Sequence, residues 1–154
     1  MKKLQFALLL CLSATLSFAQ DVHFKSGREK NNNKPQLFAK EPARISVKAD
    51  FFNKVLSFKV DQRVTVAVAS TVSFSGKVTA ITHDAPGLET IIMQSTETPG
   101  LVLSLSKVNI PGEGIQYRGI MMSKGHSDML MLEKDMVTGN YVWNKKSVAH
   151  MIPD

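Results

Sequence analysis

Short apolar runs alternate with turn signals through the second half of the chain, beginning at Val72. The runs are VSFSGKVTAIT, ETIIMQS, LVLSLSKV, IQYRGIMMS, DMLMLEKD and YVWNKK. Each run is long enough for a strand, and too short or too regularly alternating for a good helix. The connecting segments carry Gly or Pro, at which chains reverse direction, and are HDAPG, TETPG, NIPGEG, SKGHS and MVTGN. The pattern predicts an antiparallel meander.

Residues 63–70 add the clearest strand of the sequence. Valines alternate there with smaller or polar residues, which is typical of a strand with one buried face. Residues 61–62, Asp and Gln, would form the turn that precedes it. In the next strand, Gly76 interrupts the period and predicts a bulge or a close backbone approach.

Residues 51–56 leave two structures open. Four apolar side chains would share one stripe of a short helix, namely those of Phe51, Phe52, Val55 and Leu56. Asp50 could cap that helix, but the segment would also fit two strands joined by a turn. The short helix is the preferred interpretation, and a strand over residues 56–60 is expected to follow it.

These elements predict an all-β domain over residues 44–154, built as a single antiparallel meander of seven to eight strands. The continuous apolar run at residues 129–132 is typical of a strand covered on both faces. A barrel and a sandwich show the same alternation, so the sequence leaves both architectures open.

The first residues have the pattern of a secretory signal peptide. Lys2 and Lys3 form a positive n-region, FALLLCLSATL supplies an apolar h-region, and SFA offers small residues to a signal peptidase. We expect cleavage after Ala19, hence a signal peptide over residues 1–19 and export to the periplasm or the exterior. A membrane anchor is the alternative, but the apolar run is shorter than the about 20 residues that a spanning helix needs.

Cys11 is the only cysteine, and it lies within this predicted leader. A lipoprotein signal would have small residues directly before the cysteine, whereas three leucines occupy positions 8–10, so lipidation is not expected. The mature chain would then contain no cysteine. That would exclude disulfides, a thiol nucleophile and cysteine-ligated zinc.

Residues 20–43 are polar and offer little to bury, so we expect a flexible arm there. The formal charge of the chain is +6, and without Lys2 and Lys3 it is +4, from 17 basic and 13 acidic side chains. This mild excess could favour acidic partners. It lacks the dense Lys/Arg stripe interleaved with aromatics that nucleic-acid binding requires, so no nucleic-acid partner is expected.

No catalytic or metal-binding constellation is evident in the sequence. The four histidines, at positions 23, 83, 126 and 150, have no metal-ligand spacing. Consecutive residues such as His126-Ser127-Asp128 cannot take up the geometry of a hydrolytic triad. The loop NIPGEG lacks the Lys and the helix start of a phosphate-binding loop. We therefore expect a non-enzymatic protein without a metal or cofactor.

Two groups of side chains are candidates for binding. Met121, Met129 and Met131 belong to a methionine-rich second half and could line a groove for apolar partners, although core packing is the favoured explanation. Tyr141 and Trp143 share a face of the last predicted strand. They could close one end of a barrel or form a hot spot on an exposed face.

The phrases FSGKV at residues 74–78 and YRGI at residues 117–120 occur in a particular order among the strands. The valine strand precedes them, ETIIMQS lies between them, and LEKD and Pro153 follow them. From Leu56 onward this order resembles the N-terminal prodomain of secreted bacterial zinc metallopeptidases. No zinc-binding helix follows in this sequence, so the resemblance implies a prodomain-like inhibitor or folding assistant of an exported metallopeptidase.

A prodomain-like protein would cover its partner's cleft, or add a strand to the edge where the peptidase binds substrate. The resemblance implies that Asp21 or His23 would displace the zinc-bound water, since the mature chain would have no cysteine. A different class of function is an envelope β-barrel that binds a small apolar ligand in its methionine-rich half. A structural envelope component is a third.

Overall fold

The computed structural model describes residues 34–48 and 50–151 of the chain. In this part, eight strands form one antiparallel sheet, accompanied by a short α-helix and a 3₁₀ turn. The strands are β1 (Arg44–Ser46), β2 (Arg63–Ala67), β3 (Ser73–Ala85), β4 (Leu88–Ser95), β5 (Leu101–Ile110), β6 (Gly114–Ser123), β7 (Asp128–Lys134) and β8 (Tyr141–Ser147). The helix is α2 (Phe51–Leu56) and the 3₁₀ turn is η2 (Val148–Met151). The predicted all-β antiparallel fold is confirmed.

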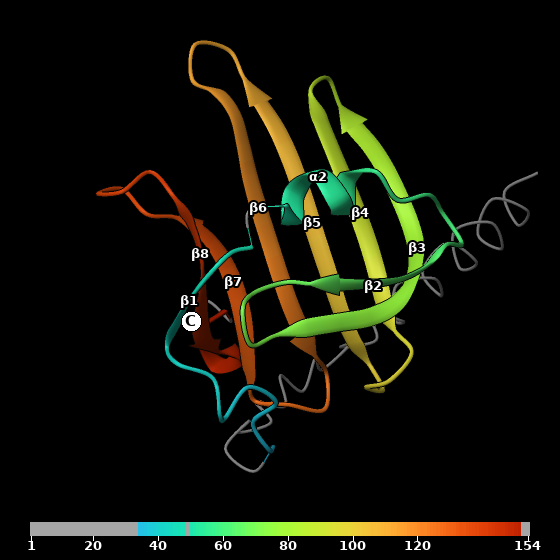
Figure 1. The fold of residues 1–154 in the computed structure, drawn as a ribbon, viewed down its shortest axis with the longest axis vertical. Helices are drawn as coiled ribbons and strands as arrows, with labels where there is room; N and C mark the ends of the chain where they lie inside the picture. Colours follow the sequence, from blue (N-terminus) through green and yellow to red (C-terminus); the bar gives the residue numbers. More distant parts are fainter. Residues whose placement is uncertain (1–33, 49, 152–154) are drawn as a thin grey trace, which may run out of the picture.

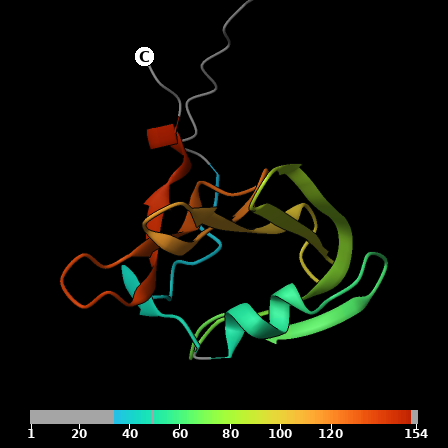
Figure 2. The ribbon, with the colours of Figure 1, turned by 90° about the horizontal axis from the view of Figure 1, so that it is seen from above.

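The strands follow the order β1-β8-β7-β6-β5-β4-β3-β2, so each strand from β2 to β7 pairs with the next one in sequence (Figure 1). The predicted meander is therefore confirmed. Figure 2 shows that the sheet curls into a half-barrel, with α2 lying across its open side. An isolated antiparallel bridge between Val47 and Ala69 links the chain beyond β1 to the chain beyond β2. The sequence leaves a barrel and a sandwich open; the described residues form one curled sheet, a half-barrel.

The concave face of the sheet carries the hydrophobic core. Along β5, Leu101, Leu103 and Leu105 are buried while the residues between them are partly exposed, as a strand with one covered face requires. The predicted helix is confirmed, because α2 buries Phe51 and Val55 completely. Asp50 occupies its N-cap position but makes no side-chain capping hydrogen bond. The core thus has two layers, a curled sheet and one short helix.

The strand expected over residues 56–60 is wrong. The amides of Ser57 and Phe58 donate to the helix carbonyls of Lys54 and Val55, which ends α2 in a turn. The Lys59 amide then donates to the side chain of Gln62. These local bonds use the backbone groups that a strand would need for pairing. The turn predicted at residues 61–62 is present, and Asp61 adopts a positive φ of 69° there.

Gly76 lies where three strands approach one another, pairing with Val64 of β2 and with Ser95 of β4. A Cβ at this position would lie 2.3 Å from the carbonyl oxygen of Gln94 and 2.7 Å from the ring of Phe74. The predicted close backbone approach is confirmed. The register of β3 shifts further along, after Val78.

We expect Gly76→Ala to lower the free energy of unfolding by about 3 kcal/mol or more, since the obstructing atom is a backbone oxygen held in the sheet. Urea denaturation followed by circular dichroism would measure this. Gly125→Ala is the matched control, because its Cβ would come no closer than 3.9 Å to Ser123 Oγ. A midpoint for Gly76→Ala equal to that of the control would contradict the close approach.

Residues 34–43, the end of the polar arm expected over 20–43, lie against the sheet. The carboxylate of Asp128 is buried and accepts the amides of Leu37 at 2.7 Å and Phe38 at 2.9 Å. Lys145 Nζ donates to the carbonyl oxygens of Glu41 at 2.7 Å and Phe38 at 3.2 Å. The Phe38 side chain is 6% exposed and belongs to the core. This segment is thus bound through its backbone by β7 and β8.

Replacing Asp128 with Asn should lower the free energy of unfolding by about 1.5–3 kcal/mol, because two charge-assisted hydrogen bonds lose their carboxylate acceptor. Hydrogen exchange at the Leu37 and Phe38 amides should accelerate. Asp50→Asn is the control, as its side chain is exposed and makes no capping bond. Unchanged protection of both amides in Asp128→Asn would show that the anchor is not needed.

Candidate functional site

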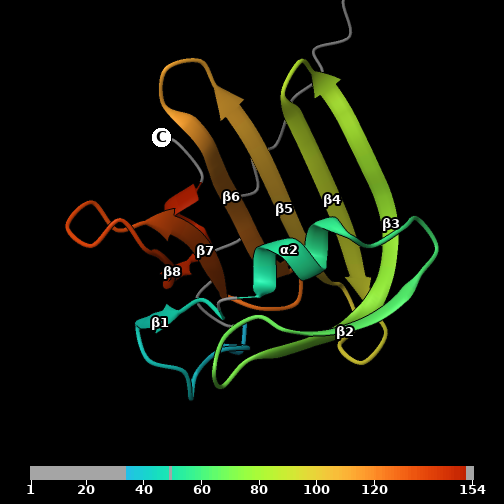
Figure 3. The same ribbon diagram turned by 45° about the horizontal axis from the view of Figure 1, so that its top comes forward.

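The sheet is split between β6 and β7. These strands pair over residues 119–122 of β6 only, whereas residues 114–118 pair with β5 and with no other described strand. β7 meanwhile pairs with β8 as far as Lys134. Figures 1 and 3 show the β5–β6 and β7–β8 pairs leaning apart from the point where they meet. One edge of β6 therefore faces a gap in the sheet over five residues.

Aromatic side chains fill the inner side of this split. Phe52 of α2 stacks on Tyr117 of β6, with ring centroids 4.1 Å apart and planes 11° apart. It meets Tyr141 of β8 edge-on at 5.2 Å. The Tyr141 hydroxyl accepts the amide of Tyr117 at 2.9 Å. A side chain thus satisfies a strand amide that points toward β7, and the rings form a closed floor under the split.

Gly119 marks the point where β6 and β7 begin to diverge. It pairs with Leu132, and a Cβ at this position would lie 3.0 Å from the Trp143 ring and 3.2 Å from Leu132 Cβ. Trp143 is completely buried and packs edge-on against Phe51 at 5.8 Å. The glycine of the YRGI phrase is therefore explained by the space that the indole needs.

On the outer face, the split opens into a cleft of about 440 Å³. Its lining includes Ser104, Ser106, Arg118, Ile120, Met131 and Glu133. These residues alternate with core residues along their strands, so they project from the convex face. The cleft combines an apolar patch with polar groups around it, which is typical of a binding site rather than of a core defect.

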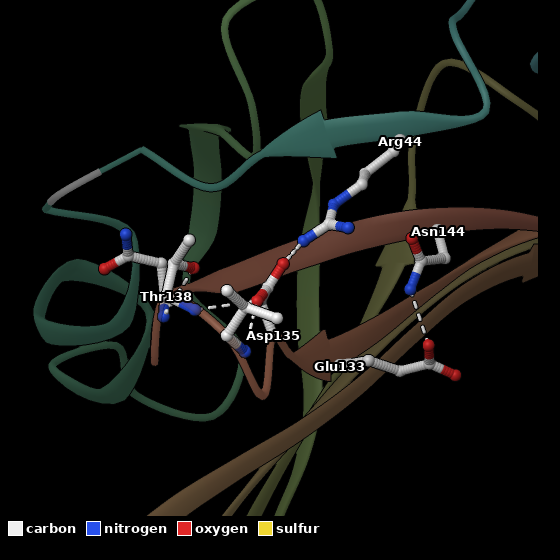
Figure 4. A network of polar contacts seen from close by, with 7 residues as sticks. Arg44, Glu133, Asp135, Thr138 and Asn144 are labelled. Atoms are coloured by element: carbon white, nitrogen blue, oxygen red, sulfur yellow. Dashed lines mark hydrogen bonds and ion pairs between the residues drawn. The ribbon is translucent and has the colours of Figure 1, made fainter.

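The acidic group of the cleft is already paired. The hydrogen bond from Lys146 lowers the pKa of the Glu133 carboxyl; partial burial opposes it, and the hydrogen bond from Asn144 lowers the pKa further. Figure 4 shows the Asn144 amide directed at this carboxylate. Arg118 and Lys134 form no ion pair with another described residue. The charge available to a ligand in the cleft is therefore positive.

The structure separates the predicted binding residues into three groups. Asp21 and His23 lie outside the described residues. Met121, Met129 and Trp143 are completely buried, with exposures of 1%, 0% and 0%. Met131 and Tyr141 are half-buried, and both line the cleft.

The sequence analysis did not single out Arg118, Ser104 or Ser106. In the segment LVLSLS, apolar residues alternate with the serines, which indicates that the serines face away from the core. This pattern could have identified Ser104 and Ser106 as exposed to a ligand. No sequence pattern predicts that β6 diverges from β7. The contacts at that point join residues far apart in sequence, in α2, at Gly119 and at Trp143.

No protein-family model, characterised protein or solved structure matches the chain significantly. Within residues 34–48 and 50–151, no helix has the length and hydropathy needed to cross a bilayer. In the same residues, His, Asp and Glu side chains do not gather in threes at metal-binding distance.

The Glu133 interaction predicts a pH-dependent contribution to stability. Because the folded pKa is lowered, wild type should be more stable than Glu133→Gln above the ordinary carboxyl pKa, and this advantage should disappear as the pH falls through the folded pKa. The side chains of Glu133 and Lys146 are 38% and 40% exposed, so the difference should stay below about 1 kcal/mol. Urea titrations at several pH values measure it, with Glu97→Gln in an exposed loop as the control. A difference that grows toward acid pH would contradict the assignment.

Proposed function

We propose that this chain is an exported, non-enzymatic binding protein whose cleft between β6 and β7 takes up an extended segment of a partner protein. The observation that carries the proposal is the edge of β6 at residues 114–118, which pairs with none of the described strands on the β7 side. An extended segment can add to such an edge, gaining affinity from main-chain hydrogen bonds and selectivity from alternate side chains.

The orientation of the β6 backbone supports strand addition. The Tyr117 amide points across the split toward Tyr141, so the N–H and C=O groups of residue 115, two positions earlier, point the same way. Ile115 is 52% exposed, which leaves its surroundings accessible. A segment in the cleft would thus meet main-chain groups of β6 along one side.

The side chains of the cleft favour a particular segment. Arg118 and Lys134 would attract a carboxylate, since Glu133, the acidic side chain among the described lining residues, is paired with Lys146. Ile120 and Met131 would contact an apolar side chain next to it. The expected ligand is an extended segment that alternates acidic and apolar residues.

The partner class follows from the resemblance to metallopeptidase prodomains and from the signal-like leader. We propose an exported metallopeptidase, which the protein inhibits or helps to fold, with Asp21 or His23 directed at the catalytic zinc. Prodomain-like inhibition and strand addition are compatible because they use different parts of this chain: the β6 edge would take up a segment of the partner, and the residues around Asp21 and His23 would reach the partner's cleft.

A small apolar ligand is the second candidate. The cleft volume of about 440 Å³ lies in the range of about 300–1,000 Å³ that is typical of small-molecule sites. Ile120 and Met131 supply its apolar patch. In that case the protein should carry a bound compound through purification, detectable by native mass spectrometry.

Affinity capture of envelope and secreted proteins, followed by mass spectrometry, tests the proposal. Ile115→Pro should reduce capture of the partner at least tenfold, because proline removes an amide on the free edge, whereas Ile115→Thr keeps that amide and should bind like wild type. Arg118→Glu should also weaken binding. Equal capture by the Pro and Thr variants, both folded by circular dichroism, would rule out strand addition at this edge.

A further inference from the structure

The tip of the β7–β8 hairpin exposes two adjacent apolar side chains. Met136 is 92% exposed and Val137 is 94% exposed, well above the other exposed large hydrophobic residues in the described part of the chain. Figures 2 and 3 show the hairpin projecting from the half-barrel. An apolar pair at the end of a projection contributes nothing to the core and is accessible to another apolar surface.

Hydrogen bonds hold this tip in one conformation. Asp135 Oδ1 accepts the amides of Val137 at 2.7 Å and Thr138 at 2.8 Å. The backbone of Asp135 also bonds to Gly139 and Asn140, at 2.8 and 2.7 Å. Arg44 of β1 forms an ion pair with the same carboxylate (Figure 4). Because the tip is fixed in advance, its binding would require little ordering of the loop.

The surroundings of the tip are positively charged. Lys134 is exposed at the base of the hairpin, and exposed Lys48 lines a groove beside residues 138–140. Neither lysine forms an ion pair with a described residue. The two acidic side chains of the hairpin, Glu133 and Asp135, are both paired with basic partners. An apolar tip is therefore flanked by unpaired cations.

We propose that the β7–β8 hairpin binds anionic phospholipid bilayers, with Met136 and Val137 entering the interface and Lys134 and Lys48 contacting the headgroups. A protruding tip needs only a deformable apolar layer, whereas a protein partner would need a pocket of matching shape. Positive charge beside apolar groups is the combination that anionic membrane surfaces attract. The inference shares Lys134 with the cleft lining, but it rests on Met136 and Val137, which lie outside the cleft, and it does not depend on the peptidase hypothesis.

A fluorophore at the tip tests this inference in the full chain. Cys11→Ser removes the only native thiol, and Val137→Cys allows labelling with the polarity-sensitive dye NBD. The matched control is Val60→Cys, an apolar site that is 49% exposed on the turn before β2. The probe is a vesicle of phosphatidylcholine with about 30% phosphatidylglycerol, compared with phosphatidylcholine alone at low ionic strength. The label reports on the tip even if the apolar leader also meets the vesicle.

At position 137, we expect a blue shift and a several-fold rise in emission with anionic vesicles. Neutral vesicles or added Lys134→Gln should weaken the response, and position 60 should show none. In unlabelled Cys11→Ser protein, adding Met136→Ser and Val137→Ser should lower the share of vesicle binding that depends on anionic lipid at least tenfold. Equal responses at 137 and 60, or a response independent of anionic lipid, would overturn the proposal. A response to protein concentration without vesicles would also overturn it, in favour of a second copy of the chain.

Discussion

The packing of α2 against β6 and β8 is the interaction on which the shape of the sheet depends. Phe51 contacts Trp143 and Phe52 stacks on Tyr117, so a six-residue helix binds strands on either side of β7. Full burial of Phe51 is worth about 1.5–3 kcal/mol, the half-buried Phe52 contributes less, and each aromatic contact adds about 0.5–1.5 kcal/mol. These gains offset the hydrogen bonds, about 1 kcal/mol each, that β6 and β7 do not form where they diverge. The cleft is thus a by-product of a well-packed core.

Much of the fold could be predicted because local patterns and tertiary packing agree. The alternating runs produce β3 to β8, and the apolar stripe at residues 51–56 produces α2. The strand expected at residues 56–60 failed because helix and turn bonds use the same backbone groups. Strand β1 has three residues, too few for a recognisable period. No local pattern predicted the role of Asp128, whose carboxylate accepts hydrogen bonds from amides about ninety positions earlier in the chain.

The candidate site was less predictable than the fold for a physical reason. Met131 and Tyr141 were identified by residue type, but only the divergence of β6 from β7 brings them together with Arg118. Gly119 is the last residue of β6 paired with β7 before the strands diverge, and the ring of Trp143 occupies the space that a side chain there would need. The alternation of apolar and polar residues predicts which face of a sheet a residue occupies. It does not predict where two neighbouring strands stop pairing.

The pairing of β1 with β8 joins the first and last described strands, and it limits the order in which the chain can fold. β1 pairs with β8 alone among the described strands, and residues 34–43 are bound by Asp128 and Lys145. The meander from β2 to β7 can form hairpin by hairpin as the chain emerges, since neighbours in sequence are neighbours in the sheet. Its amino-terminal part cannot dock until the last strand has arrived. A chain emerging from a ribosome would therefore keep Ile45 and Phe51 without their Trp143 partner until β8 has emerged.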